Sequence, residues 1–260
     1  MTQYDDTKYP RNFIKQVICR IDFLDYIEEE FLFDTTVVSE IIKSYSMKEK
    51  DQIMRFNMIN IIGSNLNVSG QSIDGIQRTY TTPDGKNKII ISNKYIISEI
   101  NNYDTFESII TNLQRILKAI FKRKAINVVR TGIRYINIYD EDQIKVMKKY
   151  FSQIIASTIS TTVAKHDETI KMTRSIHLAQ YSVDGMTLNF RFGLYNKNYP
   201  STIKKNDFTL DFDCFTQEAI NNTDEIIRYL KKGHDAIRCL FEGSITNDLR
   251  KVMNEVVNNE

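Results

Sequence analysis

The sequence predicts an α+β fold, built as two lobes of antiparallel β-sheet packed with long amphipathic helices. Alternating apolar and polar residues indicate strands, and apolar stripes at helical spacing indicate helices. In both halves of the chain a group of strand-like segments precedes a helix. With 42% hydrophobic and 26% charged residues, the 260-residue chain has the composition of a folded globular protein.

The first half opens with a strand over 13–23, where every second residue from Val17 to Phe23 is apolar. A short helix follows, because apolar residues from Val37 to Tyr45 recur at three- and four-residue spacing. Further strands are expected over 52–62, 73–82, 88–92 and 95–100, with a turn at Pro83-Asp84-Gly85.

The clearest helix is expected over 105–124, where eight apolar residues form one stripe. Asp104 is the expected N-cap, and Glu107 is its capping-box partner. The basic run Lys122-Arg123-Lys124 suits the negative end of this helix, which we favour over a phosphate site.

The second half repeats this style. Asp184-Gly185 is a strong hairpin turn between two alternating runs. The expected elements are a strand over 126–138, a long helix over 141–159, hairpin strands over 172–183 and 186–195, a strand over 208–215, and helices over 223–242 and from Thr246. The natural boundary lies near Asp140, which predicts an N-terminal lobe over 1–140 and a C-terminal lobe over 141–260.

Charge, cysteine content and hydropathy restrict the class of protein. The net charge of +2 gives no general attraction to nucleic acid or membrane. The N-terminus does not resemble a signal peptide, and no run approaches the ~20 apolar residues of a membrane span. Cys19, Cys214 and Cys239 form neither a disulfide framework nor a zinc motif, so three buried thiols in a reducing compartment are expected. These features predict a cytoplasmic protein without membrane contact.

Common catalytic and cofactor motifs are absent from the sequence. It contains no P-loop, no dinucleotide-binding glycine motif, no G-x-S-x-G and no H-E-x-x-H. We therefore predict no cofactor and no nucleotide-dependent chemistry of the usual kinds.

Asp211 and Asp213 are the sharpest candidates for chemistry, because residues two apart on a strand share a face. Joined by Asp22 from another strand, they would offer carboxylates to a divalent cation, as in metal-dependent nucleases. The simpler interpretation is that Leu210, Phe212 and Cys214 face the core and both aspartates face water.

A second candidate is a polar network. His234, Arg238 and Glu242 are four residues apart on one predicted helix face, which suggests an acid–base role for His234. The alternative is a structural network in which Arg238 pairs with Glu242. Arg20 and Arg134 complete the set of candidate network residues.

Nucleic acid is a further candidate partner, because basic and aromatic residues interleave in two strands. Aromatic rings on a sheet face stack bases, while nearby arginines hold phosphates. The residues concerned are Arg130, Arg134, Tyr135, Tyr139, Arg191, Phe192 and Tyr195. Alternatively, the aromatics belong to the core and the arginines pair on the sheet surface.

Four motifs occur in a fixed order along the chain. They are Arg20-Ile-Asp-Phe23, Gly132-Ile-Arg-Tyr-Ile-Asn137, Leu210-Asp-Phe-Asp213, and the final His234-x-x-Ile237-x-x-x-Phe241-Glu242-x-x-Ile245-Thr246. Together they resemble a sporadically distributed bacterial family of about this length whose members have no established activity. The resemblance implies a cytoplasmic α+β protein and carries over no catalytic residues.

These observations lead to two functional hypotheses. The first is a non-catalytic interaction or regulatory module that binds a protein partner or forms a homo-oligomer. The sporadic distribution of the resembled family suggests a subunit of a bacterial accessory or phage-defence system. The alternative is a metal-dependent nuclease, or another phosphoryl-processing enzyme, that uses Asp22, Asp211 and Asp213 with a divalent cation.

Overall fold

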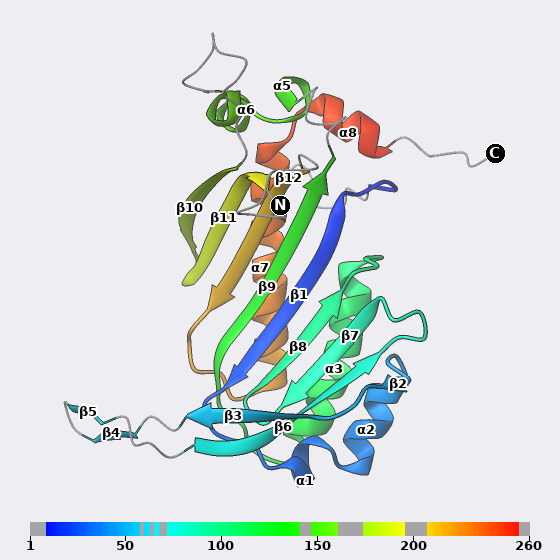
Figure 1. Cartoon of the computed structure of the whole chain (residues 1–260), viewed down its shortest axis with the longest axis vertical. Helices are drawn as coiled ribbons and strands as arrows, with labels where there is room; N and C mark the ends of the chain where they lie inside the picture. Colours follow the sequence, from blue (N-terminus) through cyan, green and yellow to red (C-terminus); the bar gives the residue numbers. More distant parts are fainter. Residues whose placement is uncertain are drawn as a thin grey trace. The chain divides into compact units, whose positions relative to one another are not determined.

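Figure 1 shows a computed structural model of the chain, which describes residues 9–57, 60–62, 65–67, 72–140, 147–160, 174–195 and 207–254. The predicted α+β class is confirmed, since antiparallel strands and separate helices make up the described residues. None of the described helices is both long enough and apolar enough to cross a membrane.

Ten strands of the described residues belong to one sheet. They are β1 (Ile14–Phe23), β2 (Met47–Lys48), β3 (Gln52–Asn57), β6 (Ser72–Thr81), β7 (Asn87–Ser92), β8 (Tyr95–Ile100), β9 (Val128–Tyr139), β10 (Ser175–Val183), β11 (Met186–Tyr195) and β12 (Asp207–Thr216). The order of hydrogen-bonded neighbours is β10-β11-β12-β9-β1-β8-β7-β6-β2, and β3 also pairs with β6. Strands β4 (Asn60–Ile62) and β5 (Asn65–Asn67) form a separate pair.

The helices of the described residues differ greatly in length. They are α1 (Glu29–Leu32), α2 (Thr35–Ile42), α3 (Phe106–Phe121), α5 (Met147–Tyr150), α6 (Gln153–Ser160), α7 (Thr223–Ser244) and α8 (Asn247–Asn254). The prediction of one long helix over 141–159 is wrong for the described residues from 147 onward. Two short helices, α5 and α6, occupy this stretch, and Phe151 and Ser152 separate them. The backbone there bonds across to the end of α7: Ser152 donates to Ser244, and Thr246 donates to Tyr150. These bonds replace the helical bonds that a continuous helix would need.

The order of elements repeats between the two halves of the chain. In each half, one long strand (β1 or β9) is followed by short helices, a three-strand meander (β6-β7-β8 or β10-β11-β12) and a long helix (α3 or α7), and in the first half β2 to β5 come before the meander. The first hairpin of each meander turns at an Asp-Gly pair, Asp84-Gly85 and Asp184-Gly185. Both glycines have positive φ, at 68° and 80°, which glycine adopts without steric cost. The topology therefore makes β6 and β10 equivalent strands.

The chain forms two compact units, each drawn from separate stretches of sequence. One unit takes its described residues from Met1–Val17, Gly132–Thr216 and Tyr229–Glu260, and the other from Ile18–Thr131 and Gln217–Arg228. This division differs from the contiguous lobes expected on either side of Asp140, because β1, β9 and α7 each contribute residues to both units.

In the unit that contains α3, the core lies between that helix and one face of the strands. Cys19, Ile21 and Phe23 of β1 are buried, as their alternation predicted. The apolar stripe of α3 is buried as well, except for the half-buried Phe121 at its end. Its N-cap is Thr105 rather than the expected Asp104, because the Thr105 hydroxyl accepts from the Ser108 N–H. The C-terminal end is basic as predicted, with Arg123 paired to Asp34 at 2.5 Å and Lys124 paired to Glu28 at 2.5 Å.

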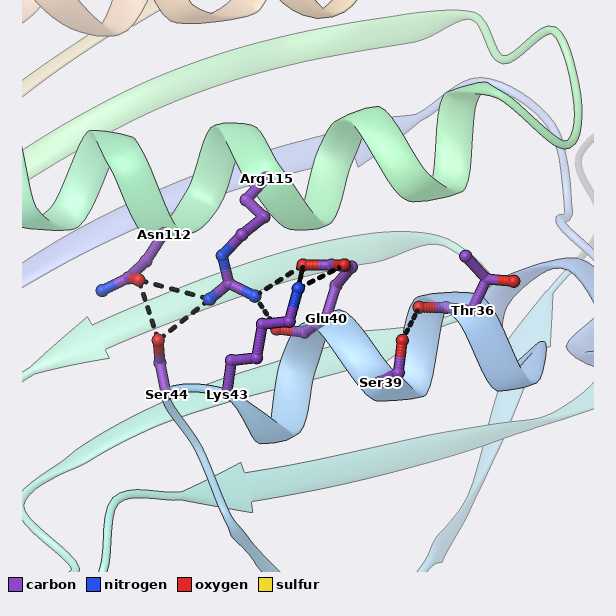
Figure 2. Close-up of polar contacts among 7 residues, drawn as sticks. All are labelled: Thr36, Ser39, Glu40, Lys43, Ser44, Asn112 and Arg115. Atoms are coloured by element: carbon purple, nitrogen blue, oxygen red, sulfur yellow. Dashed lines mark hydrogen bonds and ion pairs between the residues drawn. The ribbon is translucent and has the colours of Figure 1, made fainter.

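Arg115 of α3 links this helix to α2 through several hydrogen bonds (Figure 2). The Arg115 guanidinium donates to the Glu40 carboxylate at 2.9 Å and also to the Glu40 carbonyl oxygen. Its other terminal nitrogen donates to Ser44 Oγ at 2.9 Å and to Asn112 Oδ1 at 3.3 Å. Lys43 adds a second cation at the Glu40 carboxylate, 2.7 Å away. Since every partner belongs to α2, α3 or the residues just after α2, we interpret this network as structural.

In the other unit, α7 packs on the face formed by β9, β11 and β12. Gly233 of α7 allows this close approach, since a Cβ there would lie 2.9 Å from Ile133 Cγ2 and 3.5 Å from Cys214 Cβ. Phe190 and Phe212 stack on neighbouring strands with their centroids 4.5 Å apart. Asn222 caps the helix by accepting from the Glu225 N–H, and it lies one residue before the expected start of this helix at 223.

Tyr139 and Tyr135 lie on the same face of β9 but differ in how their hydroxyls are satisfied. Tyr139 is fully buried among aromatic rings, and among the residues that the structure describes its hydroxyl has no hydrogen-bond partner. Burial raises the pKa of this phenol well above its usual value. The Tyr135 hydroxyl is instead hydrogen-bonded to His234 Nδ1 at 2.9 Å.

We therefore expect opposite results from removing these two hydroxyls. Tyr139→Phe should leave the free energy of unfolding equal or raise it by about 1 kcal/mol, because an unsatisfied buried hydroxyl is removed. Tyr135→Phe should lower it by about 1 kcal/mol, because a hydrogen bond is lost. Urea unfolding of both variants checks this pair, and the reverse order of stabilities would contradict it.

Candidate interaction site

The candidate metal ligands are paired with arginines in the structure. The Asp211 carboxylate accepts from Arg134 Nε and Nη2, both at 2.7 Å, and from Arg191 Nη1 at 3.4 Å. This bidentate pairing raises the pKa of the Arg134 guanidinium. Asp211 is buried, although the simpler interpretation had placed it in water. Its neighbour Asp213 is half-buried.

Asp22, in the other unit, likewise lies beside two arginines. It accepts from Arg20 Nε at 2.8 Å and lies 4.0 Å from Arg130 Nη1. The Arg20 guanidinium also lies over the Tyr95 ring, 5.2 Å from its centroid. Within the described parts of the chain, no group of three or more His, Cys, Asp or Glu side chains is placed to hold a metal ion.

The three polar residues predicted on one helix face all belong to α7. His234 is bonded to Tyr135, as described above, and Glu242 is buried and accepts from Tyr9 and Arg250. Arg238 lies between them in the sequence and is half-buried. The i+4 spacing thus predicted correctly that the three residues lie on one helix. It did not predict the partners of His234 and Glu242, because these residues come from distant parts of the chain.

Two of the arginine–aromatic pairs considered for nucleic-acid binding lie on opposite faces of their strands, namely Arg134 with Tyr135 and Arg191 with Phe192. Tyr135 and Phe192 are buried beneath the helices, whereas their neighbours Arg134 and Arg191 point to the other face and pair with Asp211. Adjacent residues of a strand always point to opposite faces. Arg134 with Tyr135, and Arg191 with Phe192, therefore do not form the expected platform of stacked bases beside arginines, whereas Tyr195 is 43% exposed on the same strand face as Arg191.

Strand β10 has features that the sequence analysis did not single out. It pairs antiparallel with β11 from Ser175↔Leu194 to Val183↔Met186, and it is the last strand in the order of neighbours (Figure 1). No residue of β10 is buried, whereas half or more of each of β11 and β12 is. Leu178 is 64% exposed and Ile176 is 43% exposed. Both belong to the face opposite the helix-covered side, since they alternate with His177, which stacks on buried Phe192.

The composition of β10 leaves its edge unprotected. Its nine residues, SIHLAQYSV, include no Lys, Arg, Asp, Glu or Pro. Natural sheets usually place charged residues or proline on an edge strand, because free backbone N–H and C=O groups otherwise pair with other chains. The edge of the equivalent strand β6 is hydrogen-bonded to β2 and β3. These two strands carry the basic residues Lys48 and Arg55, the kind of residue that natural edge strands usually have. Among the described residues, nothing pairs with β10 on the side away from β11.

The position of β10 is fixed from its inner side. His177 stacks on Phe192 of β11, and Gln180 donates to Asn189 on β11 at 2.9 Å. Gly193 of β11 permits close approach of the two backbones, since a Cβ there would collide with the Ser175 carbonyl oxygen. The edge is therefore held as an extended strand, ready to accept a further strand.

Neither the family models nor the curated proteins compared with this chain give a match. The resemblance to a bacterial family through the four motifs stays a prediction. The candidate site consequently rests on its geometry.

Proposed function

We propose that this chain is a non-catalytic interaction module that binds a protein by adding an extended strand to the edge of β10. The observation that carries the proposal is the state of β10 itself, an end strand without charge, proline or a buried residue. Backbone hydrogen bonds would supply affinity, and Ile176 and Leu178 would supply apolar contacts on one face.

The form of the partner follows from the equivalent strand in the other half of the chain. There β6 pairs antiparallel with β3 from Gln52↔Gln77 to Asn57↔Ser72. By analogy, the β10 partner is an extended segment with an apolar residue facing Leu178. We also propose that the protein consists of two lobes. In each lobe a long helix, α3 or α7, would support the strands.

A cytoplasmic setting is supported by the cysteines. Cys19, Cys214 and Cys239 are all free, and burial raises the pKa of the Cys19 and Cys214 thiols to about 12. Cys239 is exposed, which differs from the expectation of three buried thiols. A place in a bacterial accessory or phage-defence system has its support in the family resemblance alone.

The alternative, a metal-dependent nuclease or other phosphoryl-processing enzyme, stays a prediction. Its aspartates would have to exchange their arginine partners for a metal ion. Since Asp211 already accepts three hydrogen bonds from two arginines, that exchange has a substantial cost. The geometry therefore favours the interaction module.

Photo-crosslinking tests the proposal at the edge strand. Leu178→p-benzoylphenylalanine in the native host should give one discrete crosslinked chain. With that chain purified, amide hydrogen exchange should slow in 175–183, because a new strand would protect the outward N–H groups of β10. No such protection is expected in β11, whose amides already pair on both sides.

Ile53 provides a matched control, because it is an aliphatic residue on a strand and is 82% exposed. The same photo-reactive residue at Ile53 should not crosslink to that chain. Equal crosslinking from both positions, or a purified partner that leaves exchange in 175–183 unchanged, would rule the proposal out.

A further inference from the structure

We propose that the strand added to β10 is β10 of a second copy of this chain, in an antiparallel pair with a two-fold axis at Leu178. This inference rests on the proposed interaction function and names its partner. It predicts a symmetric dimer in which the sheets of the two copies join edge to edge.

The side chains of β10 are self-complementary in this register. Leu178, the most exposed large apolar residue of the strand, would face Leu178 of the second copy. Ile176 would face Gln180 of the second copy and lie diagonally from its Leu178. On the other face, His177 would face Ala179 of the second copy, and its ring would keep its stack on Phe192. One symmetry operation thus covers the apolar side chains that β10 exposes on its open face.

Charge does not oppose this pairing. The strand carries no acidic residue, lysine or arginine, so no like-charged side chains of β10 meet across the axis. The whole chain has a net charge of only +2, and general repulsion between two copies is therefore weak. A strand used by diverse partners would more often carry charges that select among them.

The oligomeric state of the full chain tests the proposal. Sedimentation of the wild-type protein at micromolar concentration should give twice the 30.4 kDa chain mass. Leu178→Lys places two ammonium groups opposite each other at the axis, and we expect dimer dissociation to become at least about 100-fold more favourable. Because Leu178 is exposed in the single chain, the variant should stay folded by circular dichroism. The control Ile53→Lys should remain dimeric.

Disulfide trapping tests the register. In a Cys239→Ser background, Leu178→Cys should oxidise to a covalent dimer, since directly opposite Cα atoms lie about 4.5–5.5 Å apart, within disulfide reach. Gln180→Cys should not crosslink, because the two sulfur-bearing residues would be separated by four positions, roughly 13 Å along the strand.

Each outcome decides between the proposals. A monomeric wild-type protein, a dimer unaffected by Leu178→Lys, or trapping at Gln180→Cys in place of Leu178→Cys would overturn the two-fold pairing proposed here. A monomer that still crosslinks through position 178 to a different protein would leave the interaction module standing. A monomer without any such partner would remove both.

Discussion

Gly193→Ala is expected to lower the free energy of unfolding by about 3 kcal/mol or more and to detach β10 from β11. Gly193 has a φ of +148°, which L side chains rarely adopt. Its new methyl group would also meet the carbonyl oxygen and carbon of Ser175 and the Cα of Ile176. These are backbone atoms of the neighbouring strand, so relief requires the strand to move.

The effect of Gly193→Ala should be largest at the hairpin. Urea unfolding measures the loss of stability, and amide exchange measures how far 175–183 opens. The variant should also lose the β10-dependent association, because the edge would no longer be held in register with β11.

Gly243→Ala is the matched control for this prediction. Gly243 lies in α7, and a Cβ there would have no neighbour within 4 Å. Alanine should therefore raise the free energy of unfolding by about 0.5 kcal/mol, because the unfolded chain loses freedom and the helix gains propensity. If both variants changed stability alike, the steric explanation at Gly193 would be wrong.

Arg250→Ala is expected to lower the free energy of unfolding by about 3–5 kcal/mol. The Glu242 side chain is only 3% exposed and accepts from Arg250 Nε at 2.8 Å. Without this arginine, the buried carboxylate loses its cation and, of its partners among the described residues, keeps the Tyr9 hydroxyl, which donates to it at 2.8 Å. Burial and the adjacent Glu242 raise the pKa of the Tyr9 phenol, which therefore remains a neutral donor near pH 7.

Arg228→Ala supplies the comparison for Arg250→Ala. Arg228 pairs with Glu225 on the same helix at 3.2 Å, but both side chains are more than two fifths exposed. Removing this solvated pair should cost less than about 1 kcal/mol. Joint replacement of Glu242 and Arg250 by leucine should restore much of the stability lost in Arg250→Ala, because no uncompensated charge remains. Similar losses in the two single variants would contradict the assigned burial of Glu242.

Much of the secondary structure could be predicted from local patterns. Alternation located β1, with Cys19 and Ile21 on its buried face, and the apolar stripe located α3. The Asp184-Gly185 pair predicted a hairpin that the structure confirms, with positive φ at both residues. These elements are encoded in short stretches, because strand and helix periodicity depend on neighbours only a few residues apart.

The break near Phe151 could not be predicted in this way. The apolar spacing on either side favours one long helix, but the backbone of 150–152 bonds to Ser244, the last residue of α7, and to Thr246 just after it. Helix propensity is a weak preference that such tertiary hydrogen bonds override. The candidate sites show the same limit, since Asp211 was recognised as a carboxylate on a strand without its arginine partners.

Strand alternation in the sequence already separates some of the arginines from the aromatics. Arg134 and Tyr135 of β9, like Arg191 and Phe192 of β11, are adjacent in sequence, and adjacent strand residues point to opposite faces. Applied to Arg134 and Tyr135, that rule separates them, as the structure does. The uncharged composition of 175–183 was likewise visible, but its meaning depends on knowing that this strand ends the sheet.

The sequence by itself determined the α+β class, most strand and helix positions, the turns at the two Asp-Gly pairs, and the absence of common cofactor motifs. Only the tertiary structure decided that Asp22 and Asp211 pair with arginines, that Glu242 is buried beside Arg250, and that β10 is an end strand. The physical reason is the range of the interactions. Periodicity and turn chemistry act between near neighbours, whereas ion pairing and strand order join residues far apart in the chain, which become neighbours only on folding.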